Sequence, residues 1–297
     1  MDLSVVIVTW NSRGYLSDCL ESIRSQEGDL ATEIIVVDNA SSDGTPELVR
    51  ERFPHAHLII NSDNLGYTRA CNLGLQRASG RLVLILNPDT RLQPGSLGLM
   101  IDYLGDHPGV GVLGPQLLNP DGSIQPSCRR FPSYRLMLWE FTGLSRLFPE
   151  HPVFGAWRMG DFDHRETRPV DQPMGACLLL RREALDRVGL MDERFEMFFN
   201  DVDLCRRLTA AGWKIVFFPL ARVVHDAGSH VRRVRYRMIL TSHKDCLRYF
   251  RKVRRGLLDE LDSVLLGLGL LISFVPRVLL SFLRRLPRAQ TSSAPRF

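Results

Sequence analysis

The stretch RLVLILNPDTRL, residues 81–92, places a carboxylate at the end of an apolar run. Nothing alternates within that run, which is typical of a strand buried on both faces. Asp89 therefore emerges from a core at a point where a carboxylate can bind a cation. The letters LNPD recur at 118–121, but there Asp121 precedes Gly122, which favours a plain surface turn. We expect the first copy to carry the chemistry.

Three similar apolar runs precede this one, with helix-like stretches between them. This β-α alternation predicts a parallel sheet covered by helices, which binds ligands at the carboxyl ends of its strands. Each polar residue there could be an ordinary turn or cap residue, but four polar strand ends together favour a site. The predicted strands are 4–10, 33–39, 57–61 and 81–87, the predicted helices are 15–26, 45–52, 67–78 and 94–105, and the strand-end residues are Thr9, Asn11, Asp38, Asn39, Asn61, Asn64, Asn87 and Asp89.

The sequence lacks the usual backbone cradles for phosphate. The turn after the first strand, TWNSRGYL, contains one glycine where a dinucleotide-binding turn needs several, and no Walker sequence is present. A site built on carboxylates instead holds phosphate oxygens through a hard divalent cation, Mg²⁺ or Mn²⁺.

Two features of the second half bear on a reaction. In MGACLLLRREAL, residues 174–185, a predicted strand is entered through Gly175 and Ala176, whose small size would let a substrate approach the backbone. Asp201 and Asp203 begin a predicted amphipathic helix, and positions two apart on a helix point away from each other. One of them can be a base while the other favours the helix start.

Five segments in order resemble the motifs of family 2 inverting glycosyltransferases of the GT-A fold, and the likeness is nearest to bacterial rhamnosyltransferase-type enzymes. The resemblance extends from about residue 3 to about residue 230. It implies an α/β, mainly parallel Rossmann-like sheet with helices on both faces, and a catalytic domain at 1–229 with a nucleotide-sugar-binding half (1–107) and an acceptor half (108–229). The segments are SVVIVTWNSRGYLSDCLESI, IIVVDNASSDGT, NLGYTRACNLGL, LILNPDTRL and FFNDVDLCRRL.

The resemblance also assigns roles. It makes Asp201 the catalytic base, although Asn200 replaces the acid of the family's usual Glu-Asp pair; we expect Asn200→Glu to be tolerated. It makes Asp89 and His225 metal ligands, with Asn87 in place of the motif's first acid. From spacing alone, a lone histidine is more often structural than a ligand. The residues expected to contact the nucleotide sugar are Thr9, Asn11, Asp38, Asn39, Asn64, Gly66, Asn72, Asn87, Gly175 and Ala176.

The implied reaction is a metal-dependent, inverting transfer of a sugar, with rhamnose as a candidate, from a dTDP- or UDP-sugar. The acceptor is a glycan or a polyprenyl-linked sugar in cell-surface polysaccharide synthesis. Two alternatives remain open: a non-catalytic basic α/β adaptor that binds nucleic acid, and a nucleotidyltransferase. The second of these leaves the late segment FFNDVDLC unexplained.

Charge divides the chain. Residues 1–229 have a net charge of −6 and residues 230–297 one of +11. The longest uncharged run of this basic and amphipathic tail has 14 residues, fewer than the roughly 20 of a membrane span. We expect residues 230–288 to bind an anionic membrane surface rather than nucleic acid. The scattered cysteines and the absence of a signal-peptide pattern predict a cytoplasmic protein, peripheral on the inner face of the cell membrane.

Overall fold

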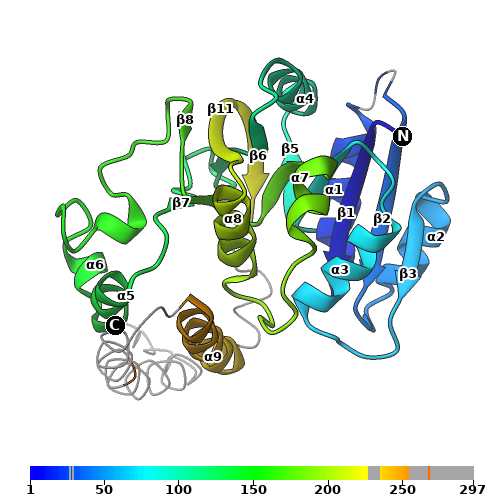
Figure 1. The fold of residues 1–297 in the computed structure, drawn as a ribbon. Helices are drawn as coiled ribbons and strands as arrows, with labels where there is room; N and C mark the ends of the chain where they lie inside the picture. The colour runs from blue at the N-terminus through cyan, green and yellow to red at the C-terminus, as the bar shows by residue number, and fades with distance from the viewer. Residues whose placement is uncertain (27, 29, 227–234, 254–266, 268–297) are drawn as a thin grey trace, which may run out of the picture.

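The computed structural model describes residues 1–226 except 27 and 29, residues 235–253 and residue 267. This part of the chain folds around a nine-stranded sheet with the order β3-β2-β1-β4-β10-β6-β11-β5, and β8 pairs with β11 (Figure 1). A separate ladder joins β7 to β9. The strands are β1 (Leu3–Thr9), β2 (Thr32–Asp38), β3 (His57–Ile60), β4 (Leu82–Leu86), β5 (Thr90–Leu92), β6 (Val110–Leu118), β7 (Cys128–Arg129), β8 (Arg168–Pro169), β9 (Gln172–Pro173), β10 (Cys177–Arg181) and β11 (Lys214–His225).

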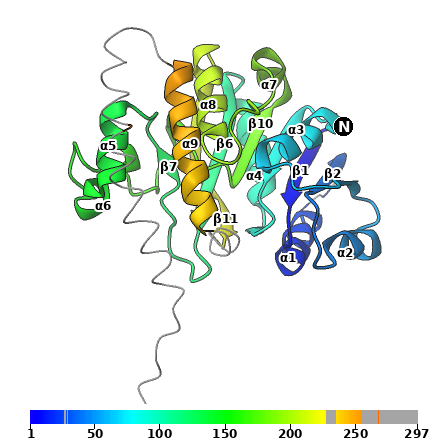
Figure 2. The same cartoon turned by 90° about the horizontal axis from the view of Figure 1, so that it is seen from below.

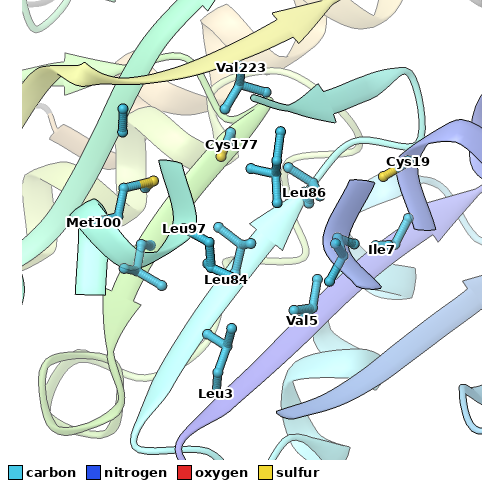
Figure 3. Packing of buried hydrophobic residues seen from close by; sticks show 14 of the residues in the cluster. Leu3, Val5, Ile7, Cys19, Leu84, Leu86, Leu97, Met100, Cys177 and Val223 are labelled. Atoms are coloured by element: carbon cyan, nitrogen blue, oxygen red, sulfur yellow. The ribbon is translucent and has the colours of Figure 1, made fainter. Parts of the chain in front are cut away.

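Helices cover both faces of this sheet, as predicted. The apolar side chains of α1, α2 and α4 pack on one face, and those of α3, α7 and α8 on the other. Figure 3 shows part of the first cluster, in which alternate residues of β1 and β4 point to one side of the sheet, toward α1 and α4. The helices are α1 (Arg13–Arg24), α2 (Thr45–Arg52), α3 (Tyr67–Arg77), α4 (Ser96–Asp106), α5 (Tyr134–Thr142), α6 (Leu144–Leu147), the 3-10 helix η1 (Ala156–Arg158), α7 (Arg182–Val188), α8 (Asn200–Ala210) and α9 (Arg235–Val253).

The first four predicted strands form the parallel half of the sheet. Thr9 is the register partner of Asp38, so neighbouring strand ends lie at one edge. The other half is mixed, because β10 runs antiparallel between β4 and β6. Cys177 pairs with Leu86, so the chain enters β10 from the carboxyl edge of β4. The residues just before β10 therefore belong to the ligand edge.

Two predicted boundaries need correction. The segment 174–185, expected to be one strand, is β10 followed by α7, which begins at Arg182. The predicted tail does not begin at residue 230, because α9 packs on the body beside α8 (Figure 2). Tyr249 is fully buried, and its hydroxyl accepts a hydrogen bond from Arg206 of α8 at 2.9 Å. The remaining tail residues, 230–234, 254–266 and 268–297, lie outside the described residues.

Asp203 connects α8 to α9, which is more than the helix-start role predicted for it. Its side chain is 3% exposed and bonds the Nε of Arg207 at 2.9 Å and the Nζ of Lys252 at 2.5 Å. Lys252 also contacts Asp192 at 2.7 Å. Breaking a buried ion pair costs far more than losing a helix-start charge, because the partners are left without compensation.

We predict that Asp203→Asn lowers the free energy of unfolding by about 3 kcal/mol, the low end for a buried pair, because Arg207 and Lys252 keep some contact with water. The exposed Asp186 of α7 provides the control, since Asp186→Asn should change stability by less than about 0.5 kcal/mol. Urea denaturation measures both. Equal midpoints for the two variants would show that Asp203 has no such role.

Candidate functional site

The carboxyl edge of the sheet borders a cavity of about 1870 Å³. Both halves of the chain line it, so the structure brings together most of the residues selected from the sequence. Asn11, Asp38 and Asn72 are not among its lining residues. The predicted residues that do line it are Thr9, Asn39, Asn64, Gly66, Asn87, Asp89, Gly175, Ala176, Asp201 and His225.

Two buried oxygen atoms at the ends of β1 and β2 lack hydrogen-bond partners among the described residues. They are the Oγ1 of Thr9 and the Oδ1 of Asp38. The other carboxylate oxygen of Asp38 accepts from the backbone N–H of Ser41 at 2.9 Å. Burying an unpaired polar atom costs free energy, which a ligand that pairs with it recovers. These two atoms are suited to the polar groups of a nucleoside.

Asn39 organises the loop between β3 and α3. Its Nδ2 donates to the Oδ1 of Asn64 at 2.9 Å, and its Oδ1 accepts from the N–H of Leu65 at 2.9 Å. The loop ends at Gly66, whose φ of 82° and ψ of 164° suit only glycine. Asn39 thus holds the wall of the cavity in shape.

Asn11 and Asn72 hold loops together at sites away from the cavity. Asn11 accepts from the N–H of Ser42 at 2.8 Å and so joins two neighbouring loops. Asn72 is buried, and its amide bonds the backbone of Met191 in both directions, at 2.8 and 3.1 Å. The expectation that Asn72 contacts the nucleotide does not fit this placement, because its amide is occupied within the protein.

Asp89 and His225 form the candidate metal pair. The Nε2 of His225 lies 3.5 Å from the Oδ1 of Asp89, and both side chains are almost fully buried. Burial lowers the pKa of His225, against the opposing effect of Asp89. The imidazole is therefore neutral at neutral pH, as a metal ligand must be. The described residues contain no group of three or more His, Cys, Asp and Glu suited to a metal, so this pair would leave coordination positions for substrate and water.

A chain of hydrogen bonds fixes the tautomer of His225, and it begins in the second copy of LNPD. Hydrogen bonds from Ser123 lower the pKa of Asp121, so this ionised carboxylate can only accept. The hydroxyl of Ser123 donates to it at 2.6 Å and accepts from the Nδ2 of Asn119 at 2.9 Å. Every later bond then has one possible direction.

The Oδ1 of Asn119 accepts from the Nε2 of Gln125 at 2.9 Å. The Oε1 of Gln125 consequently faces the Nδ1 of His225 at 2.8 Å and accepts its proton. The Nε2 of His225 keeps its lone pair on the side of Asp89, which is the tautomer that binds a metal. The predicted surface turn at Asp121 is confirmed, and this turn also supports the candidate site.

Asp201 lies in the first turn of α8. Its Oδ2 accepts from the Nε2 of Gln172 at 3.0 Å and from the N–H of Gly175 at 3.1 Å. Burial raises the pKa of Asp201 despite these hydrogen bonds. A raised pKa brings a carboxylate nearer to the value that suits a general base at neutral pH.

Gly175 lines the cavity, and its small size also makes room for Asp201. A Cβ at position 175 would lie 3.2 Å from the Oδ2 of Asp201. Asn200 is also committed: its Nδ2 donates to the Oγ1 of Thr68 at 2.9 Å and to the carbonyl of Met197 at 3.2 Å. A glutamate cannot donate these bonds, so we no longer expect Asn200→Glu to be tolerated.

The loop before Asp201 depends on α9. The buried carboxylate of Asp245 accepts from the N–H groups of Glu196, Met197 and Phe198 at 3.1–3.3 Å. Sequence reasoning missed Asp245, Gln125 and Gln172. Asp245 is the one acid in 230–255, beside ten basic residues, and this exception was a visible signal. The two glutamines lie in segments without periodicity and gave none.

The chain is similar to known glycosyltransferases. Residues 4–189 match the family described as "Glycosyl transferase family 2". A relative from Mycobacterium tuberculosis, N-acetylglucosaminyl-diphospho-decaprenol L-rhamnosyltransferase, is 35% identical over 257 residues, covering 82% of this chain and 81% of that protein. The O-antigen biosynthesis protein RfbC of Myxococcus xanthus is 28% identical over 240 residues, covering 77% of this chain and 18% of that protein.

Two solved structures share the fold. The mannosyltransferase PcManGT from Pyrobaculum calidifontis, in complex with GDP-Man and Mn²⁺, has a TM-score of 0.57 at 18% identity, covering 95% of this chain and 74% of that chain. TarS 1–349 of S. aureus has a TM-score of 0.56 at 17% identity, covering 94% and 82%. These likenesses confirm the predicted GT-A-type architecture.

We predict that Gln125→Leu converts His225 to the Nε2–H tautomer, because the Nδ1 proton loses its acceptor while the Nε2 can donate to Asp89. Nitrogen chemical shifts of the imidazole, measured by NMR without added metal, report the tautomer. Mn²⁺ affinity should fall by about 10- to 100-fold. Gln125→Glu keeps an acceptor and should keep the Nδ1–H form of His225. Asp121→Ala should change the tautomer and the Mn²⁺ affinity less than Gln125→Leu does, because water can replace an exposed carboxylate. An Nε2–H tautomer in the unmodified protein would refute the chain of bonds.

Proposed function

The chain belongs to glycosyltransferase family 2, and from this we propose that it transfers a sugar, with inversion, from a nucleoside-diphospho sugar to a lipid-linked sugar. The observation that carries the proposal is one cavity lined by the Asp89–His225 pair and by the buried carboxylate of Asp201. The M. tuberculosis relative, matched over most of both chains, supports rhamnose as the sugar and an N-acetylglucosaminyl-diphospho-lipid as the acceptor. Of the two donors expected from the sequence, we propose a dTDP-sugar rather than a UDP-sugar.

The donor nucleoside is proposed to lie at the ends of β1 and β2. The unpaired oxygens of Thr9 and Asp38 would accept from base or ribose donors. The loop held by Asn39 and ended by Gly66 forms the adjacent wall. The candidate base, on α8, lines the same cavity, and we propose that an acceptor hydroxyl beside it attacks the donor sugar opposite the leaving diphosphate.

Asp89 and His225 fit a divalent cation, because an oxygen and an imidazole lone pair face each other at the edge where the diphosphate would lie. Such a cation would supply positive charge for the diphosphate as it leaves. Asp201 would take the proton of the acceptor hydroxyl, and its raised pKa favours that transfer. Gln172 and Gly175 keep the carboxylate oriented, which lowers the cost of reaching a reactive geometry.

Nothing favours the two other functions. Among the described residues of α9, Arg248 and Lys252 are engaged with Asp245, Glu196, Asp192 and Asp203, so these two are not free to bind nucleic acid. The family membership argues against a nucleotidyltransferase. None of the described helices is long and apolar enough to cross a membrane. We propose that the chain attaches peripherally to the inner membrane face through residues after α9.

A donor screen tests the proposal directly. Purified protein with Mn²⁺, a short-chain prenyl diphospho-N-acetylglucosamine acceptor and dTDP-rhamnose should give a rhamnosylated lipid, detected by mass spectrometry. UDP- and GDP-sugars serve as competing donors. Transfer from another donor would reassign the sugar, and no transfer from any nucleotide sugar would reject the function.

We predict that Asp89→Ala abolishes the gain in donor affinity that Mn²⁺ provides, because the remaining His225 is a single ligand. Chelation of the metal in the unmodified protein should have the same effect. Calorimetry with the donor diphosphate measures both. Asp102→Ala, at an exposed position on α4, is the control and should bind as the unmodified protein does. Unchanged Mn²⁺ dependence in Asp89→Ala would remove Asp89 from the metal site.

We predict that Asp201→Asn lowers the transfer rate by about 10²- to 10⁴-fold while donor affinity persists, because the amide cannot accept a proton. In the unmodified protein the rate should fall as pH falls through the pKa of Asp201. Because burial raises this pKa above 3.8, the decline should begin at a higher pH than an exposed aspartate would give. An unchanged rate in the variant would exclude Asp201 as the base.

We predict that residues 254–297 are needed for membrane attachment. They contain seven arginines and three acidic residues around the apolar run 263–276, and each basic residue near an anionic surface contributes about 1 kcal/mol. A chain ending at Val253 keeps α9 and therefore the fold. Full-length protein should float with phosphatidylglycerol vesicles at low salt and the shortened chain should not. Equal flotation of two folded proteins would reject attachment through this segment.

A further inference from the structure

Arg129 is a partly buried cation that lines the cavity and forms no ion pair with a carboxylate among the described residues. In the part of the chain that the structure describes, its two hydrogen bonds end on main-chain carbonyls, those of Pro126 at 3.1 Å and Cys128 at 2.6 Å. Burial, and after it the charge of Arg158, lower the pKa of Arg129. The charge of Glu140 opposes this shift, and an anionic ligand beside Arg129 would oppose it further.

The acid near Arg129, Glu140, is already bound to two other arginines. Glu140, which is 6% exposed, accepts from the Nε of Arg158 at 2.8 Å and from its Nη2 at 2.6 Å. Arg146 lies 3.4 Å from the same carboxylate. Three guanidinium groups therefore surround one carboxylate, and all four side chains except Arg158 line the cavity. This corner of the cavity carries excess positive charge.

Two more polar groups lie beside Arg129, and both of their residues line the cavity. The Nε1 of Trp157 lacks a hydrogen-bond partner among the described residues. The hydroxyl of Ser127 contacts only the weakly bonding thiol of Cys128. The guanidinium of Arg129 lies 5.5 Å from the Trp157 ring. An indole N–H can only donate, and a hydroxyl can donate, so both can bind an oxyanion together with Arg129.

The position of Arg129 relative to Asp201 indicates which anion fits. Arg129 is the register partner of Gln172 across the β7–β9 ladder, and Gln172 holds the carboxylate of Asp201. Facing residues of such a ladder have Cβ atoms about 5 Å apart. Arg129 and the candidate base thus lie on neighbouring elements that line the same cavity, with Gln172 between them. The donor diphosphate belongs at Asp89 and His225.

We infer that Arg129, with Trp157 and Ser127, binds the diphosphate that links the acceptor sugar to its lipid, while the attacking hydroxyl of that sugar faces Asp201. This inference rests on the proposed function and adds the group that recognises the acceptor. It makes this chain selective for diphosphate-linked acceptors over neutral glycosides of the same sugar.

The test compares two acceptors that share N-acetylglucosamine and a short prenyl chain, one joined through a diphosphate and the other a neutral glycoside. Arg129→Gln should raise the KM for the diphosphate acceptor by about 10- to 100-fold, the usual effect of losing hydrogen bonds to a charged group. The KM for the neutral acceptor and the affinity for the donor should stay within about twofold. Arg129→Lys should show an intermediate loss, since lysine keeps the charge without the planar fork.

Arg130→Gln is the matched control, because the neighbouring Arg130 is half exposed and its partner, Asp161, lies 3.9 Å away. Thermal unfolding of each variant confirms the fold. An equal rise in KM for the two acceptors would overturn the inference and give Arg129 a structural role. A loss of donor affinity would overturn it as well and place Arg129 in the donor site.

Calorimetry with the diphosphate acceptor alone separates this inference from the proposed function. If the unmodified protein binds this acceptor and Arg129→Gln does not, the inference stands even when no transfer is detected. If the unmodified protein transfers sugar to both acceptors with equal KM, the function stands and the inference fails.

Discussion

The burial of the Asp201 carboxylate against the backbone of Gly175 is the contact on which the site depends. Glycine at position 175 makes room for it, since a Cβ there would lie 3.2 Å from the carboxylate and push it by a few tenths of an ångström. The contact also requires β10 to run antiparallel to β4, because only then does the residue before β10 lie at the edge where the parallel strands end. The same burial raises the pKa of the carboxylate and suits it to accept a proton.

Support for this contact comes from parts of the chain far apart in sequence. Gln172, on the short strand β9, donates to Asp201 and pairs across its ladder with Arg129. Asp245 of α9 holds the loop that leads into α8. α9 is therefore structural for the site, although its sequence is that of a basic tail. Two of the basic residues of α9, Arg248 and Lys252, form ion pairs with Asp245 and Asp203 and so stabilise the body.

The two copies of LNPD illustrate how burial decides chemistry. The first copy ends a strand buried on both faces, and Asp89 faces His225. The second copy forms an exposed turn, yet its carboxylate sets the direction of the hydrogen bonds that reach His225 through Gln125. An acceptor-only group at one end of such a chain fixes the tautomer at the other. An exposed carboxylate thus acts on a buried histidine without contacting it.

The sequence by itself determined the elements and the polar residues at their ends. Apolar runs and helix patterns are local, so β1, β2, β4, α2 and the start of α8 were predicted within a few residues, and with them Thr9, Asp38, Asp89 and Asp201. The resemblance supplied His225. Only the tertiary structure showed that Asn72 does not line the cavity. It also revealed the roles of Gln125, Gln172, Asp245 and Arg129. Their bonds join residues up to 100 positions apart, and side-chain amides and single charges in irregular segments have no periodicity that reveals such a contact.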